Sequence, residues 1–227
     1  MLLLFFILSL ALSGVTLLSR NRGLTRVFVL AFSALLIAFT VHAWINRGNT
    51  EFIWFTYDST AVLLLSVLTL LSVPTIYHGF IYTRDDTLKR YNIYHSGLIA
   101  LMTFMAGAYL ANTMTVMWIF VEATTLAVAV LIYHDRTEMS LEATWKYVFV
   151  CSTGIAVAYL GILFLGFIYG RGDAPNLSFS SFSHLIGNAN PLYLKIAFLF
   201  VVVGFSTKMG LFPMHTVTID AHSVAPP

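Results

Sequence analysis

The sequence predicts an all-α fold, a polytopic membrane helix bundle of about seven transmembrane helices. Hydrophobic residues make up 59% of the 227 positions and charged residues 10%, against about 25% charged residues in a typical soluble domain. The mean hydropathy is +0.85. Apolar runs of about 20 residues, the length that a helix needs to cross a bilayer, recur along the chain. Runs such as AVLLLSVLTLLSV lack the alternation of β-barrel strands, so we expect helices.

The first apolar run resembles a secretory signal in length. A signal peptide carries its positive charge before the apolar stretch, whereas Arg20, Arg22 and Arg26 follow this one. We therefore expect an uncleaved first span. Together with the later runs, the expected spans are residues 2–19, 25–46, 58–82, 93–112, 114–134, 144–169 and 192–214.

The later spans differ in what supports them. The second, fourth and fifth rest on length and apolar composition. The third begins at Asp58, a residue type that caps helix N-termini. In the sixth, Gly154, Ala158 and Gly161 are small enough to let another helix approach closely. The seventh contains several residues that weaken a helix: Gly204, Ser206, Thr207, Gly210 and Pro213.

Basic residues divide unequally between alternate loops. The second, fourth and sixth loops hold Arg47 and Arg171, with Lys195 at the edge of the last span. The first, third and fifth loops hold Arg20, Arg22, Arg26, Arg84, Lys89, Arg90 and Arg136, with Lys146 at the edge of the sixth span. The positive-inside rule places the more basic loops, the first, third and fifth, in the cytoplasm. We expect an integral protein of a prokaryotic inner membrane, with the N-terminus outside and the C-terminus cytoplasmic. The loop 171–190 would then be external.

Composition also bounds the chemistry. Cys151 is the one cysteine, so the chain has no intrachain disulfide and no cysteine cluster for zinc or iron–sulfur binding. The net charge of +2 and the absence of a basic patch interleaved with aromatics argue against nucleic acid. No glycine-rich phosphate loop follows a strand-like run. We therefore expect no cofactor and no catalytic redox centre in this chain.

Glu122 is the acid expected deepest in the membrane. It lies within WIFVEATTLAVAVLIY, about eight residues into its span, or roughly 12 Å deep. A charge at that depth costs several kcal/mol and marks a functional candidate by default. Thr124 and Thr125 follow it and could hydrogen-bond or help hydrate a cavity. The alternative is a structural hydrogen bond or ion pair between helices.

Lys208 is the matching base, within IAFLFVVVGFSTKMGLF. Transporters often place ion sites where a helix is broken near the middle of the membrane, and Gly210 and Pro213 follow the lysine closely. A lysine between desolvating surroundings and a carboxylate can gain or lose a proton. The alternative is that its side chain snorkels to the interface.

Further titratable groups lie nearby in the sequence. His215 and His222 follow Lys208, with Asp220 between them, and histidine suits a proton relay. Their spacing is not a recognisable metal set, and ordinary interfacial histidines remain the alternative. Lys146 stands four residues after Glu142, a spacing typical of a surface pair that stabilises a helix, so a relay role for Lys146 is the less favoured interpretation.

Three segments carry a family resemblance: WIFVEATTL, SLEATWKYVFVCSTGIAVAYLG and GFSTKMGLFPMHTVTIDAHSVAP. They resemble the antiporter-like subunits of respiratory complex I, with relatives in membrane-bound hydrogenases and multisubunit cation/proton antiporters. The sequences EATTL and SLEATWKY are most similar to those of the large membrane subunit of group 4 nickel–iron hydrogenases. The resemblance is strong from about residue 93 onward.

The resemblance implies specific roles. Such subunits move protons through two inverted five-helix repeats. Glu122 matches the acid of the first repeat, Lys208 matches its lysine on a broken seventh span, and His215 matches a histidine of the motif that follows. Asp220 matches the aspartate of a D-A pair, and Lys146 falls where relatives often have a basic residue. Residues 217–219 depart from the common H-T-W-L-P-D-A-H, since they are Val, Thr and Ile.

The resemblance also suggests that the chain is a truncated, split or fragmentary subunit with an incomplete first inverted repeat. We divide it into residues 1–92, the first three spans, and 93–227, a partial proton-translocation module with a cytoplasmic-side end. The favoured function is a membrane subunit of a proton-translocating oxidoreductase complex, such as an NADH:quinone oxidoreductase-like or hydrogenase complex. Its expected partners are other membrane subunits, a redox module, a separate C-terminal half, membrane lipid and protons. A non-transporting assembly subunit and a cation/proton antiporter module remain open.

Overall fold

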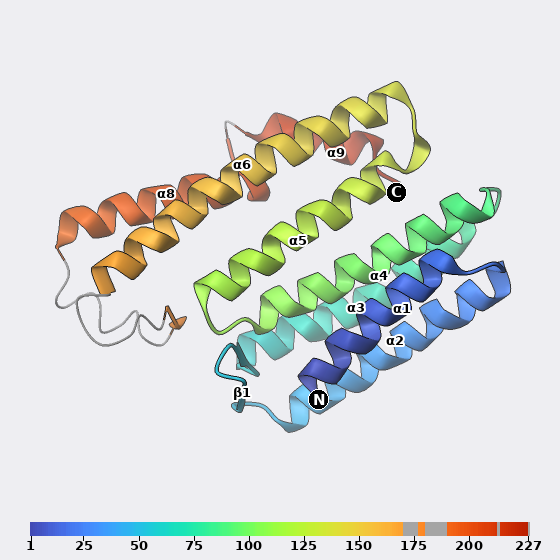
Figure 1. The fold of residues 1–227 in the computed structure, drawn as a ribbon, viewed down its shortest axis with the longest axis horizontal. Coiled ribbons are helices and arrows are strands. Elements are labelled where there is room, and N and C mark those ends of the chain that lie inside the picture. Colours follow the sequence, from blue (N-terminus) through green and yellow to red (C-terminus); the bar gives the residue numbers. More distant parts are fainter. Residues whose placement is uncertain (170–176, 180–189, 213, 227) are drawn as a thin grey trace.

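The computed structural model describes residues 1–169, 177–179, 190–212 and 214–226, and it confirms the all-α prediction (Figure 1). Within these residues, six helices are long and apolar enough to cross a membrane. They are α2 (Arg22–Ile45), α3 (Ser59–Tyr82), α4 (Leu88–Leu110), α5 (Met114–Ile132), α6 (Glu138–Tyr169) and α8 (Pro191–Met209). The shorter elements are α1 (Leu2–Leu18), the 3₁₀ helix η1 (Tyr133–Asp135), α9 (His215–Val224) and the strands β1 (Thr50–Glu51) and β2 (Phe55–Thr56).

Three of the expected boundaries differ most from the structure. The fourth span begins at Leu88 rather than 93. The sixth span begins at Glu138 rather than 144, so α6 has 32 residues and measures about 48 Å, more than the ~30 Å apolar core of a bilayer. The expected seventh span is interrupted. Helix α8 ends at Met209, Gly210 adopts a left-handed conformation with φ of 66°, and α9 begins at His215.

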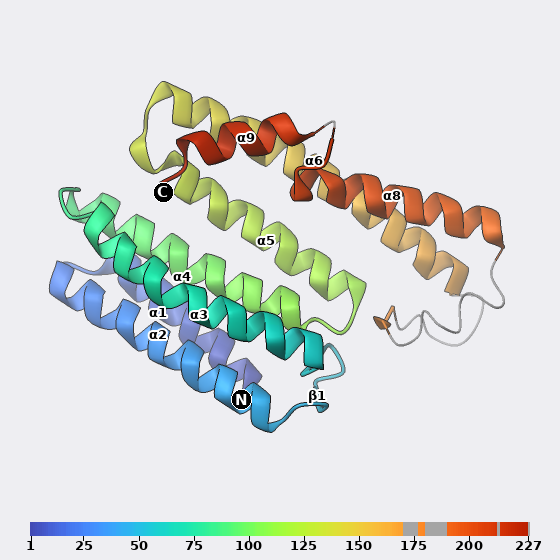
Figure 2. The same ribbon diagram turned by 180° about the vertical axis from the view of Figure 1, so that it is seen from behind.

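The hydrophobic core lies within α1–α4, which form a four-helix group (Figures 1 and 2). Phe5 of α1 stacks on Phe39 of α2 with ring centroids 4.1 Å apart. Helix α1 also meets α4 through a polar contact, in which the Ser13 and Ser96 hydroxyls lie 3.0 Å apart. Such hydrogen bonds hold helices together where lipid offers no competing water. Helix α5 packs on the outer side of α4.

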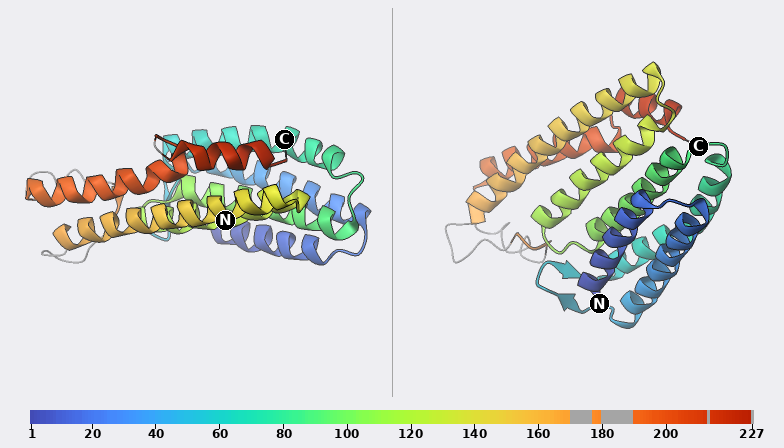
Figure 3. Two further views of the ribbon diagram at one scale, coloured as in Figure 1. Left: turned by 90° about the horizontal axis from the view of Figure 1, so that it is seen from above. Right: turned by 45° about the vertical axis from the view of Figure 1, so that its right-hand side comes forward.

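Helices α8 and α9 follow one line over α6 (Figure 3). The α6–α8 contact depends on small residues, as the sequence predicts. A Cβ atom added to Gly204 of α8 would collide with the backbone of Gly154 and Ala158 in α6. The hydroxyl side chain of Thr207 packs directly over Gly154. The backbones of α6 and α8 therefore approach closely, which fixes where the end of α8 lies against α6.

Alternate loops gather at opposite ends of the bundle. At one end, the Arg22 guanidinium donates to the carbonyl groups of Arg84 and Asp86, and His134 Nε2 lies 2.8 Å from Asp86 Oδ2. This arginine-rich end contains residues 19–21, 83–87 and 133–137. The first, third and fifth loops thus meet there.

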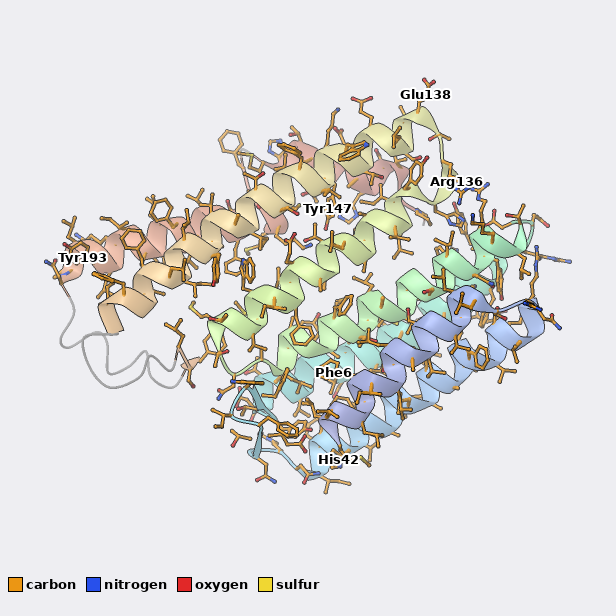
Figure 4. All side chains as sticks on the ribbon, in the orientation of Figure 1. Phe6, His42, Arg136, Glu138, Tyr147 and Tyr193 are labelled. Atoms are coloured by element: carbon orange, nitrogen blue, oxygen red, sulfur yellow. The ribbon has the colours of Figure 1, made fainter. Side chains whose placement is uncertain are left out.

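The opposite end carries the N-terminus and the small β1–β2 hairpin. The Met1 amine pairs with Glu51 at 3.8 Å, and the Asn112 side chain donates to the Ile53 carbonyl. Figure 4 shows Arg136 and Glu138 at the arginine-rich end and His42 at the hairpin end. This separation agrees with the alternation of loops that the sequence predicts.

The close α6–α8 approach predicts a strong effect of one added methyl group. Gly204→Ala should lower the free energy of unfolding by roughly 1–3 kcal/mol, because its Cβ overlaps the α6 backbone. Gly14→Ala is the matched control, since a Cβ at Gly14 meets no atom within 4 Å and alanine favours a helix over glycine by about 1 kcal/mol. Thermal unfolding in detergent measures both, and equal stability of the two variants would contradict the packing.

Candidate functional site

Lys208 lies in the last turn of α8 and reaches between two other helices. Its Nζ donates to Thr125 Oγ1 of α5 at 2.8 Å and to the Tyr147 hydroxyl of α6 at 3.0 Å. Nζ also lies 5.3 Å from the centroid of the Tyr147 ring, within the range of a cation–π contact. Figure 4 shows Tyr147 where α6 faces α5. The ammonium group is therefore held inside the protein rather than extended to an interface.

Glu122 faces the same region from α5. Its Oε1 accepts a hydrogen bond from the Ser152 hydroxyl of α6 at 2.6 Å. Its Oε2 is buried and has no hydrogen-bond partner among the described residues. A buried carboxylate oxygen without a partner is costly, and in native structures it often marks a functional group or a water site. One oxygen is thus fixed and the other is open to a proton or a water molecule.

The acid and the base are neighbours without forming an ion pair. Glu122 and Thr125 are three residues apart on α5, so they share a helix face. Lys208 is within electrostatic reach of Glu122, yet no nitrogen–oxygen distance of 4.0 Å or less joins them in the described part of the chain. Lys208 bonds the hydroxyl groups of Thr125 and Tyr147, whereas Glu122 bonds that of Ser152.

Of the two threonines after Glu122, one meets Lys208. Thr124 donates to the carbonyl of Val121 at 2.6 Å, which is a bond within its own helix. Thr125 also lies 3.3 Å from that carbonyl while it accepts from Lys208. The structure therefore brings Thr125 to the site and leaves Thr124 engaged with the α5 backbone.

Lys146 belongs to a second cluster, nearer to the arginine-rich end. Its Nζ lies 2.7 Å from Glu142 Oε1 and 3.4 Å from Asp220 Oδ2 of α9. The pair with Glu142 confirms the interaction predicted from their spacing. The Lys146 side chain is 49% exposed, so the cluster is accessible from outside the bundle. Its members line a cavity of about 200 Å³ together with Ser223 and Val224.

The remaining predicted residues are not joined to Lys208. His215 begins α9, stacks on Phe212 with centroids 5.8 Å apart, and has a buried Nδ1 without a partner among the described residues. His222 is exposed on α9. No hydrogen bond between described residues connects either histidine to Lys208. Pro213 lies outside the described residues.

Sequence reasoning missed Tyr147 and Ser152. Both lie on α6, which the sequence analysis treated as a packing helix because of its glycines and alanines. A signal was present, since polar side chains at positions 147 and 152 interrupt an apolar span. Their partners could not be read from the sequence, because Glu122 and Lys208 lie on different helices.

Comparison with known proteins places this chain in a family. Residues 111–227 match the family model described as NADH:quinone oxidoreductase/Mrp antiporter, TM. A hydrogenase-4 component F homolog of Methylacidiphilum infernorum is 36% identical over 137 residues, covering 59% of this chain and 29% of the relative. The NADH-quinone oxidoreductase subunit N of Deinococcus radiodurans is 31% identical over 170 residues, covering 73% of this chain and 32% of the relative.

A solved structure shares the fold. The chain superimposes on a chain of the membrane-bound sulfane sulfur reductase, an archaeal respiratory membrane complex, with a TM-score of 0.83 and 18% identity. The superposition covers 99% of this chain and 48% of the other. The chain spans about a third of the length of the two curated relatives, 29% and 32%.

The Ser152 hydroxyl predicts a measurable stabilisation of Glu122. Ser152→Ala should lower the free energy of unfolding by about 1–3 kcal/mol, because it leaves Glu122 Oε1 without its hydrogen-bond partner. Thr153→Val is the matched control, because the Thr153 hydroxyl is exposed and bonds the backbone carbonyl of Phe149 in its own helix. Chemical unfolding in detergent compares the two. Equal changes in both variants would show that the bond to Glu122 contributes nothing.

Proposed function

The chain belongs to the family of membrane subunits described as NADH:quinone oxidoreductase/Mrp antiporter, and we propose that it moves protons within a larger oxidoreductase complex. The family predicted from the motifs around Glu122, Lys146 and Lys208 is thereby confirmed. The observation that carries the proposal is the setting of Lys208. Its amine lies at the break between α8 and α9, is held by two hydroxyl groups, and has a carboxylate nearby but not paired with it.

The two hydroxyl groups suit both protonation states of the lysine. A hydroxyl both donates and accepts hydrogen bonds. Thr125 and Tyr147 accept from the charged ammonium, and after proton loss either hydroxyl rotates to donate to the neutral amine. Thr125 then gives up the bond to its own backbone, and Tyr147 gives up its hydrogen bond with the Cys151 thiol. Lys208 therefore keeps hydrogen-bond partners in either state, which lowers the cost of changing its charge inside the membrane.

Glu122 supplies the electrostatic control. When its carboxylate is charged, the protonated state of Lys208 is favoured; when that charge is neutralised, the lysine releases its proton more readily. The effect is a coupling free energy between two sites. We infer that redox changes in partner subunits act on this coupling. Oε1 stays bonded to Ser152, while the open Oε2 is the oxygen that takes the proton.

Lys146 and His215 extend the proposed path. Lys146 with Glu142 and Asp220 forms an exposed cluster that exchanges protons with water at the arginine-rich end. His215 begins α9, directly after the break, and its unpartnered Nδ1 offers a group that accepts or donates a proton. Water molecules would bridge the remaining separation between these groups. Asp220 and His222 play supporting roles on α9.

The partners follow from the relatives. The relatives include a hydrogenase-4 component F homolog, an NADH-quinone oxidoreductase subunit N and a chain of an archaeal respiratory membrane complex. Large apolar side chains of α6 and α8, such as Phe167 and Phe198, are exposed at 67% and 69%. We propose that lipid and other membrane subunits cover these faces, and that a redox module and the helices of a C-terminal half complete the proton path. Cation/proton exchange is the second candidate function, since the family description includes an antiporter.

Charge removal at Glu122 tests the function. The assembled complex is reconstituted into vesicles, and the number of protons translocated per electron is measured. Glu122→Gln should lower this number by roughly tenfold or more, because a positioned acid–base group typically speeds proton transfer by at least that factor. Glu122→Asp should be milder. Glu138→Gln is the control, since Glu138 is exposed and lies at the end of the bundle. Unchanged stoichiometry in Glu122→Gln, or an equal loss in the control, would remove Glu122 from the mechanism. Dependence on sodium would favour the second candidate.

Cysteine labelling tests the orientation. We propose that the arginine-rich end faces the cytoplasm of a prokaryotic cell, with the N-terminus outside and α9 on the cytoplasmic side. Lys89→Cys and Asn49→Cys place single thiols on exposed positions at opposite ends, and the native Cys151 is 1% exposed. A membrane-impermeant thiol reagent added to intact cells should label position 49 and spare position 89. The reverse pattern would invert the topology.

A further inference from the structure

A groove opens between α4, α5 and α6 near the arginine-rich end, away from Glu122 and Lys208. Its volume is about 370 Å³, within the size range of small-molecule sites. Apolar side chains from all three helices form its floor: Ile93 of α4, Ala129 and Val130 of α5, and Leu141 of α6. The groove is distinct from the 200 Å³ cavity beside Lys146 and Asp220.

The groove lies at the level where a membrane meets water. Helix α6 is longer than the bilayer core is thick, and we expect its polar first turns, which contain Glu138 and Glu142, to lie in the headgroup region. Tyr133 and Trp145 line the groove and are 38% and 63% exposed. Tyrosine and tryptophan concentrate at membrane interfaces, because their rings are apolar and their polar groups reach water. An occupant of the groove therefore has one end in lipid and the other at the surface.

Two arginines stand at the groove, and one of them is free. Arg90 is engaged, since it pairs with Asp86 and Asp135 and donates to the carbonyl of His134. Arg136 is exposed, and its guanidinium has no hydrogen bond or ion pair within the described part of the chain. Glu138, two residues further on, does not pair with it. The groove thus combines an apolar floor with an uncompensated cation at its mouth.

The backbone fixes the position of this cation. Arg136 adopts a left-handed conformation with φ of 54° at the turn between η1 and α6. Such a conformation is unfavourable for most residues other than glycine and asparagine. The turn is held by Arg90 and by the buried contact of His134 with Asp86. The backbone at Arg136 is therefore held in a defined turn.

We propose that this groove binds an anionic phospholipid, with an acyl chain over Ile93, Val130 and Leu141 and the phosphate at Arg136. Charge complementarity selects this occupant. A basic pocket between transmembrane helices attracts anionic headgroups, and the planar guanidinium matches the geometry of a phosphate. A zwitterionic lipid would meet the same floor but would leave the positive charge of Arg136 less well compensated.

Fluorescence quenching by brominated lipids tests the proposal on the full chain or its complex. Trp145 is made the only tryptophan by Trp44→Phe, Trp54→Phe and Trp118→Phe. Phosphatidylglycerol with brominated acyl chains should quench Trp145 at about fivefold lower mole fraction than brominated phosphatidylcholine, the preference expected from one basic side chain near the surface. Arg136→Asn should abolish that preference, because asparagine tolerates the left-handed backbone but carries no charge.

Arg84→Asn is the matched control. Arg84 is exposed at the same end but does not line the groove, so its variant should keep the preference for phosphatidylglycerol. Native mass spectrometry of the chain with its four natural tryptophans provides a second readout: phosphatidylglycerol retained by the parent chain should be lost in Arg136→Asn and kept in Arg84→Asn. Equal quenching by both lipids, equal loss in both arginine variants, or no quenching because a protein subunit covers the groove would each overturn the proposal.

Discussion

The structure depends on one constraint: polar groups within a bilayer must find their partners inside the protein. Lys208 shows how this constraint is met. Its ammonium draws together a threonine of α5 and a tyrosine of α6, so three helices are joined at one nitrogen atom. One carboxylate oxygen of Glu122 is bonded in the same way, by a serine of α6, while the other has no partner among the described residues. Helix α6 thus supplies a hydroxyl partner to both charged residues, although it contributes neither charge.

The reach of Lys208 depends on packing some distance from it. Gly204 and Gly154 let α8 and α6 approach until side chain meets backbone, and Gly210 ends α8 immediately after the lysine. A larger residue at position 204 would move the end of α8 away from Tyr147. Glycine thus acts twice in one short segment, first to admit a neighbouring helix and then to end its own. The sequence analysis treated Gly204 only as a residue that weakens the helix.

Much of this fold could be predicted, because an apolar run long enough to cross a membrane directly predicts a helix. The runs identified α1 to α6 and α8, and the arginines divided the loops into two sets. The predicted helix ends were wrong where polar residues continue a helix beyond its apolar run, as Glu138 and Glu142 do in α6. Among the site residues, Glu122 and Lys208 stood out because charge is rare at such depth. Tyr147 and Ser152 did not, because a hydroxyl on a span is common and its partner lies on another helix.

Helix α1 has a further consequence for the surrounding lipid. Its 17 residues cover only about 25 Å, less than the ~30 Å core of a typical bilayer. Charges fix both of its ends: the Met1 amine is paired with Glu51, and Arg20 and Arg22 follow its last turn. A span shorter than the bilayer core is accommodated by thinning of the lipid, by snorkelling of flanking side chains or by association with other helices, at a cost of a fraction of a kcal/mol per Å of mismatch. We expect shorter acyl chains to be favoured along the face that α1 presents, because they reduce this mismatch.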